Sequence, residues 1–183
     1  MGYLNNRDLR EAYDREIDSF TFFDDFFMSI AFDNNFDLVA YVLQIILKKK
    51  DIVIVSSITQ KQESNLYGRS ARYDVLAADS QGCLYHMEIE NDRARADEMR
   101  ASYYSAVLVY KNTDRGKKKV EYTENYTIFF TDADYYREGE PLYPVDRYYG
   151  QNKRPFYDKT HILYVNDIRV KRSIFTICLH NRE

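Results

Sequence analysis

The sequence contains only two cysteines and no excess of basic residues, and each of these features excludes a class of protein. Cys83 and Cys178 form no Cys-x-x-Cys pair, so we expect neither a zinc site of the usual spacing nor a disulfide framework. The formal net charge of −3 gives the whole chain no cationic field for nucleic acid. Any site for a polyanion must therefore be a local basic patch.

Long apolar segments are also absent. The N-terminal stretch MGYLNNRDLREAYDREIDS is polar and lacks the apolar core of a secretion signal. No apolar run approaches the ~20 residues that are needed to span a bilayer. Together with the sparse cysteines, this pattern predicts a protein of the reducing cytoplasm with no membrane association.

The composition is that of a globular protein, with 45% hydrophobic and 30% charged residues. A chain of 183 residues without repeats or low-complexity linkers fits one domain, residues 1–183, which can bury a substantial core. Aromatic residues make up 16% of the chain and include 18 tyrosines, which suit either stacking on bases or partners, or packing in the core.

Hydrophobic periodicity predicts helices and strands in a mixed order. This order predicts an α/β fold with a mixed β-sheet flanked by helices. We expect helices at 7–18, 20–32, 36–47 and 92–111, strands at 51–59, 72–79, 83–91, 126–133 and 160–167, and a Gly/Pro/Tyr-rich loop at 134–159.

The segment YDVLAADSQGCLYHMEIEND, residues 73–92, places acidic residues on both sides of a short turn. A three-residue loop at 80–82, with Gly82 in the left-handed conformation, puts residue 79 opposite residue 83. Counting back from this turn, Asp74 faces Glu88, and Glu90 sits opposite Arg72 on the same side. The other side is predicted to be core and carries Tyr73, Val75, Ala77, Met87 and Ile89.

Like charges directly opposite one another destabilise a sheet, so Asp74 and Glu88 require an explanation. A divalent cation between them, or protonation of one acid, would offset the repulsion. Oxygen ligands without a His or Cys set suit Mg²⁺ or Mn²⁺. The alternative is a solvated strand pair whose acids meet Arg72 and the arginines that follow it.

The same region resembles a known motif. GRSARYDVLAADSQGCLYHMEIE is similar to the central motif of PD-(D/E)XK nucleases, and most closely to the Rpn-like group of PD-(D/E)XK nuclease family transposases. Weaker similarity extends over residues 20–167 through DDFF, YTIFFTDADYYREGEPLYPVDR and HILYVN. The matching positions are Gly68-Arg69-Ser70, Asp74, the Asp79–Gly82 turn, Met87-Glu88-Ile89-Glu90 and Arg100-Ala101-Ser102-Tyr103-Tyr104.

This resemblance implies a restriction-endonuclease-like core, Mg²⁺- or Mn²⁺-dependent cleavage of DNA phosphodiester bonds, and a link to recombination or mobile elements. Carried over by position, Asp74, Glu88 and Glu90 would form the catalytic set. Asp74, Glu88 and the backbone carbonyl of Ile89 would be the metal ligands.

Two departures from the family pattern affect this expectation. Glu90 stands where the motif has Lys or Gln, and a carboxylate cannot supply positive charge. It would instead ligate a second metal, act as a general base, or mark a decayed site. The final segment DIRVKRSIFTICLHNRE does not resemble the family's helical tail, which is the pattern of a truncated or degenerate copy.

Five arginines near the motif would supply the local basic patch and grip DNA phosphates. Arg93 and Arg100 would share a face of the predicted 92–111 helix. The alternative is ordinary ion pairing with Asp92, Asp97 and Glu98. The five are Arg69, Arg72, Arg93, Arg95 and Arg100.

His86 is predicted to point to the site face, where it would act as a proton shuttle or simply be a packed strand residue. The sequence thus predicts a metal-dependent DNA endonuclease of the recombination-promoting, transposase-associated type. Two alternatives stay open. One is a catalytically inactive nuclease-fold remnant that binds DNA, and the other is an interaction module that forms a homo-oligomer through the Tyr-rich 134–159 loop.

Overall fold

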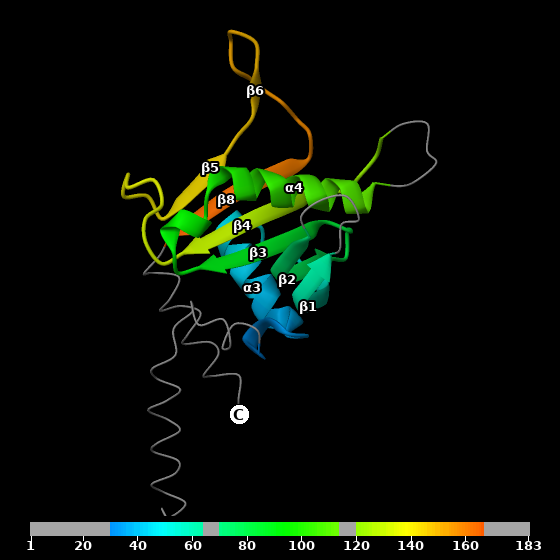
Figure 1. The fold of residues 1–183 in the computed structure, drawn as a ribbon. Coiled ribbons are helices and arrows are strands. Elements are labelled where there is room, and N and C mark those ends of the chain that lie inside the picture. The colour runs from blue at the N-terminus through cyan, green and yellow to red at the C-terminus, as the bar shows by residue number, and fades with distance from the viewer. Residues whose placement is uncertain (1–29, 64–69, 114–119, 167–183) are drawn as a thin grey trace, which may run out of the picture.

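The computed structural model describes residues 30–63, 70–113 and 120–166 (Figure 1). The helices expected at 7–18 and over most of 20–32 therefore lie outside the described residues. The elements in chain order are α3 (Phe36–Leu47), β1 (Ile54–Glu63), β2 (Ala71–Asp79), β3 (Leu84–Glu90), the 3₁₀ helix η1 (Arg93–Arg95), α4 (Glu98–Asn112), β4 (Asn125–Thr131), β5 (Leu142–Val145), β6 (Tyr148–Tyr149), β7 (Arg154–Pro155) and β8 (Thr160–Asn166).

Six strands form one mixed sheet in the order β1-β2-β3-β4-β8-β5. The first three make an antiparallel meander, because β1 pairs with β2 and β2 with β3 in opposite directions. Helix α4 then crosses over so that β4 runs parallel to β3, and β8 runs parallel to β4. The carboxyl ends of β3, β4 and β8 and the start of β2 consequently share one edge of the sheet.

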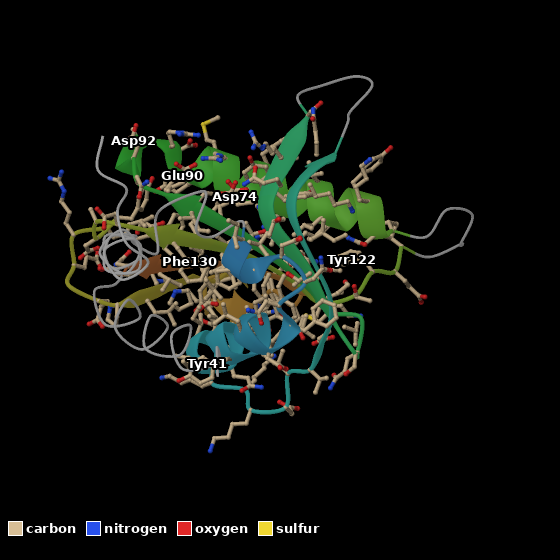
Figure 2. All side chains as sticks on the ribbon, turned by 90° about the horizontal axis from the view of Figure 1, so that it is seen from below. Tyr41, Asp74, Glu90, Asp92, Tyr122 and Phe130 are labelled. Carbon is tan, nitrogen blue, oxygen red and sulfur yellow. The ribbon has the colours of Figure 1, made fainter. Side chains whose placement is uncertain are left out.

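The sheet separates two hydrophobic clusters, and the described helices cover opposite faces of it (Figure 1). Alternation along β4 is clear: Ile128 and Phe130 pack on the α3 side, and Phe129 packs on the α4 side. In Figure 2, Phe130 lies in the interior between Tyr41 of α3 and the group formed by Asp74, Glu90 and Asp92. This layered arrangement is the α/β character predicted from the sequence.

Helix α3 has the bounds predicted from its pattern. Asn35 caps its N-terminus, because the side-chain oxygen accepts a hydrogen bond from the backbone N–H of Leu38 at 3.3 Å. The helix stops where Lys48 takes a left-handed conformation with φ of 54°. Its core-facing residues recur at three- and four-residue steps and are Leu38, Val39, Val42, Leu43 and Ile46.

Several boundaries differ from the prediction. Strand β1 begins and ends later than expected, at Ile54 and Glu63. Helix α4 begins at Glu98 instead of residue 92, because Asp97 caps it and residues 93–95 form the separate turn η1. The 134–159 region predicted as a loop contains three short strands, β5, β6 and β7.

Tyr73 is on the other side of the sheet from its prediction. It packs with Tyr104 of α4, whereas Val75, two residues later, packs in the α3 cluster. The break in alternation coincides with Asp74, where the regular pairing of β2 with β3 ends. The prediction for Tyr73 assumed strict alternation along an uninterrupted strand and therefore missed this break.

In the part of the chain that the structure describes, no helix is long and apolar enough to cross a membrane.

Candidate functional site

The turn between β2 and β3 sets the register of the site. Asp79 donates its backbone N–H to the carbonyl of Cys83 at 3.1 Å, and Gly82 adopts a φ of 79°. The Asp79 side chain closes the turn by accepting hydrogen bonds from the backbone N–H groups of Gln81 and Cys83, each at 2.9 Å. The ladder then runs from Ala78 opposite Leu84 to Val75 opposite Met87. This is the register predicted from the three-residue loop.

Where this ladder ends, the side chains of Asp74 and Glu88, instead of backbone carbonyls, accept the hydrogen bonds between the two strands. The Glu88 Oε1 atom accepts from the backbone N–H of Asp74 at 3.3 Å. The Asp74 Oδ2 atom accepts from the backbone N–H of Ile89 at 3.0 Å. The two acids are thus brought together as predicted, but each carboxylate turns toward a backbone donor of the neighbouring strand, and this weakens the repulsion expected between them.

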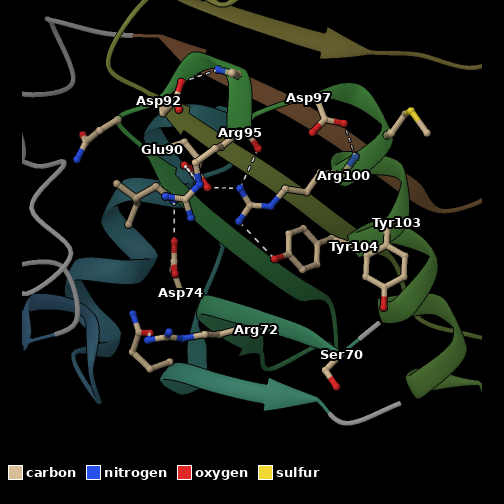
Figure 3. Close-up of a pocket in the computed structure, with 15 residues that line it drawn as sticks. Ser70, Arg72, Asp74, Glu90, Asp92, Arg95, Asp97, Arg100, Tyr103 and Tyr104 are labelled. Atoms are coloured by element: carbon tan, nitrogen blue, oxygen red, sulfur yellow. Dashed lines mark hydrogen bonds and ion pairs between the residues drawn. The ribbon is translucent and has the colours of Figure 1, made fainter. Parts of the chain in front are cut away.

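Arg100, in the first turn of α4, supplies the cation of the site (Figure 3). Its Nη2 atom lies 2.6 Å from Glu88 Oε2, and its Nη1 atom donates to Glu90 Oε1. Nη1 also donates to the backbone carbonyl of Arg95 at 2.8 Å. The guanidinium therefore bridges the two glutamates and ties them to the turn before α4.

These charged groups are buried. The Glu88 and Glu90 side chains are 1% and 4% exposed, and that of Arg100 is 20% exposed. Burial alone would lower the pKa of Arg100, but hydrogen bonds to Glu90 and Tyr104 and the charge of Glu88 outweigh it, so the net shift is upward. Arg100 accordingly stays charged at any pH at which the protein is folded.

Aromatic rings pack beside the ion pair on the α4 side. The guanidinium carbon of Arg100 lies 5.2 Å from the ring centroid of Tyr104 and 5.7 Å from that of Phe129. His86 is fully buried, and its Nε2 atom is 2.7 Å from Glu88 Oε1. Its ring packs against Tyr73 and Tyr104, with centroids 4.5 and 4.8 Å away. His86 is thus a packed residue that also contacts the acid.

A cavity of about 870 Å³ opens beside the carboxylates (Figure 3). It lies at the shared strand edge, between β2, β3 and the start of α4, and ligands of open α/β sheets bind at such edges. Its charged lining consists of Arg72, Asp74, Glu90, Asp92, Arg95, Asp97 and Arg100. Ile89 and Tyr104 also line it, whereas Glu88 lies behind this surface.

Three of the five predicted arginines, Arg72, Arg95 and Arg100, line the same cavity. Arg72 lies on the cavity wall and donates to the side chain of Gln60, and it does not face Glu90 across a ladder, since the pairing ends at Val75. Arg95 is 68% exposed and its Nε atom lies 3.5 Å from Glu90 Oε2. Arg93 begins η1, so it does not share a face of α4 with Arg100, and its side chain is outside the described part. Arg69 is outside the described residues.

The contacts of Arg100 with the β3 glutamates were not predicted from the sequence. The alternative to phosphate contacts was ion pairing with Asp92, Asp97 and Glu98, but Asp97 caps α4 by accepting from the backbone N–H of Arg100 at 2.9 Å. Tyr104 was missed as well, although its position one helical turn after Arg100 is a signal for contact between them. Pairing of Arg100 with β3 depends on how α4 docks on the sheet, which local patterns do not report.

Within the described residues, no group of three or more His, Cys, Asp or Glu side chains is arranged to hold a metal ion. Comparison of the chain with protein-family models, curated proteins and solved structures gives no match.

Proposed function

We propose that this protein is a metal-dependent DNA endonuclease with a restriction-endonuclease-like core, of the recombination-promoting type that its motif resembles. The observation that carries the proposal is that Asp74 and Glu88 each bond to the other's strand, and that Asp74 lines a cavity together with three arginines and three further acids. The β2–β3 turn supports it, because it brings the motif's two acidic positions to one sheet edge, and helix α4 then places Arg100 beside them.

The carboxylate oxygens at this site are ligands of the type that a hard divalent cation prefers. Asp74 and Glu88 offer carboxylate oxygens, and a cation already sits on Glu88 in the form of the Arg100 guanidinium. Asp74 and Glu88 would hold Mg²⁺ or Mn²⁺, together with the Ile89 carbonyl that the motif implies. Such an ion, when bound, polarises a phosphoryl oxygen and lowers the pKa of a coordinated water.

Arg100 and a divalent ion compete for Glu88, because Oε2 of Glu88 is already hydrogen-bonded to the guanidinium. An ion held by Asp74 and Glu88 would have to displace the Arg100 guanidinium from Glu88, and Arg100, which lines the cavity, would then contact a phosphate there. Arg72 and Arg95 line the same cavity and hold neighbouring phosphates of the DNA backbone. Glu90 keeps Arg95 and Arg100 positioned through its two carboxylate oxygens.

Nicking of supercoiled plasmid tests the activity. We expect the wild-type protein to nick with Mg²⁺ or Mn²⁺, to stop on addition of EDTA, and to lose activity in Asp74→Asn. The amide oxygen introduced by this substitution can still accept the Ile89 N–H, so the variant should remain folded. Equal nicking by both proteins, or none by either, would remove the basis of the assignment.

Terbium luminescence tests the metal site without reference to cleavage, since nearby tyrosines sensitise a bound Tb³⁺ ion. We expect Arg100→Gln to bind Tb³⁺ more tightly than the wild type, because the competing cation is gone, and Asp74→Asn to bind it more weakly. Unchanged affinity in both variants would contradict a metal site at these acids.

A second candidate function is favoured by the Arg100 bridge itself. If Arg100 always stays bonded to Glu88, the Oε2 atom of Glu88 cannot bind a metal ion. The protein is then a nuclease-fold remnant that binds DNA without cutting it. That alternative predicts a DNA complex that weakens steeply with salt, no nicking, and no stabilisation by divalent ions.

A further inference from the structure

The hairpin formed by β6 and β7 extends away from the sheet and has no core (Figure 1). Every residue from 144 to 157 is exposed. A two-stranded hairpin alone is at best marginally stable in water. Here its base is fastened by Arg147, which pairs with Asp158 and donates to Thr160, and by the Phe156 N–H, which donates to the Arg147 carbonyl at 2.8 Å. The hairpin is therefore built to stand out from the fold.

Aromatic rings are concentrated on this hairpin. Of the six strongly exposed Phe and Tyr side chains in the described residues, four lie here: Tyr148, Tyr149, Phe156 and Tyr157, with exposures of 54%, 53%, 55% and 90%. Large apolar groups gathered on a surface usually mark a binding site.

The rings lie on both faces of the hairpin. Tyr148 and Tyr149 are consecutive strand residues, opposite Pro155 and Arg154, so their side chains point in opposite directions. A flat protein interface would cover only one of these faces. A partner that surrounds the hairpin, or that stacks flat groups on each side of it, would cover both.

The positive charge of the hairpin favours a negatively charged partner. Residues 146–159 contain Arg147, Lys153, Arg154 and Lys159 against Asp146 and Asp158, a net charge of +2 in a chain whose total is −3. Cations interleaved with exposed rings are the chemistry by which proteins bind single-stranded nucleic acid, with the rings stacking on bases and the cations meeting phosphates.

We propose that the β6–β7 hairpin is a binding element for nucleic acid with unpaired bases. Tyr148 and Tyr149 stack on bases from opposite sides, and Lys153 and Arg154 contact the backbone. This element is separate from the Asp74–Glu88 site, so its binding does not depend on cleavage.

Fluorescence anisotropy of a dye-labelled single-stranded oligonucleotide, measured in EDTA with the full chain, tests the proposal. We expect Tyr148→Ala/Tyr149→Ala to weaken binding about tenfold or more, since each stacked base contributes a comparable amount. Tyr148→Phe/Tyr149→Phe should restore it, whereas Tyr148→Leu/Tyr149→Leu, which keeps apolar area without a flat ring, should not. Tyr110→Ala removes an exposed ring on α4 and should bind like the wild type.

Other outcomes would overturn the proposal. They are no binding by the wild type, equal binding by the Leu and Phe variants, tighter binding to duplex than to single strands, or wild-type dimers in light scattering that the Ala variant abolishes. The oligonucleotide assay is run in EDTA and reads binding without cleavage, so failure of the nuclease assignment and failure of this proposal are distinguishable.

Discussion

At the scale of single residues, Arg100 supplies the main cation for two buried glutamates. It contacts two glutamates, a backbone carbonyl and two aromatic rings, and it reaches them from a different element of the fold. The pairing of Asp74 with Glu88 could be predicted, because it depends only on the length of a turn and the period of a strand. The contact with Arg100 could not, since it requires the position of α4 on the sheet.

Arg100→Met should therefore destabilise the fold by about 3 kcal/mol in urea unfolding with EDTA, because Glu88 and Glu90 become buried charges without their main cation. Arg95→Met is the matched control: its guanidinium is mostly exposed and makes one longer contact with Glu90, so the cost should be under about 1 kcal/mol. Adding Glu88→Gln and Glu90→Gln to Arg100→Met should recover part of the loss. Equal costs for the two arginines would contradict this account.

At the scale of elements, the tight turn between β2 and β3 places Asp74 opposite Glu88, whereas the packing of α4 on the sheet places Arg100. The bounds of α3 followed from its cap and its apolar period. The start of α4 was misplaced because the polar stretch 92–97 is compatible with a helix, and only the cap at Asp97 separates it from η1. The short strands of 134–159 were missed since β6 and β7 bury nothing that would leave an apolar pattern.

Asp97→Ala should reduce the stability of the fold by about 1 kcal/mol, because the first turn of α4 loses the acceptor for the Arg100 N–H. Asp97→Asn retains a capping oxygen and should cost little. Thermal unfolding followed by circular dichroism compares the two, and a larger loss in the Asn variant than in the Ala variant would contradict the capping role.

At the scale of the whole molecule, buried tyrosines and a buried thiol make the fold sensitive to alkali. Burial raises the pKa of Cys83 to about 11, and it also raises the pKa values of Tyr85 and Tyr164. In the unfolded chain these groups ionise near their ordinary values of 9.0 for Cys and 10.0 for Tyr. Above pH 9 the unfolded state thus binds fewer protons than the folded state, and the free energy of unfolding falls.

We expect urea unfolding to require steadily less denaturant as the pH rises from about 9 to about 11, with about 1.4 kcal/mol lost per pH unit for each group ionised only in the unfolded state. Because the chain has no tryptophan, absorbance of tyrosinate can be followed without interference. Tyr85 and Tyr164 should ionise together with unfolding. Their smooth titration in a protein that stays folded would contradict the prediction.

The meander β1-β2-β3 and the crossover by α4 also imply an order of events during folding. Contacts within the meander join residues close in sequence, whereas β4 pairs with β3 only after the chain has passed through α4. Asp74 and Glu88 are 14 residues apart in the chain, and Glu88 and Arg100 are 12 apart, so both contacts can form before β4 joins the sheet. We expect loss of the Arg100 guanidinium to slow folding as well as to destabilise the finished protein, and stopped-flow refolding of Arg100→Met would measure this.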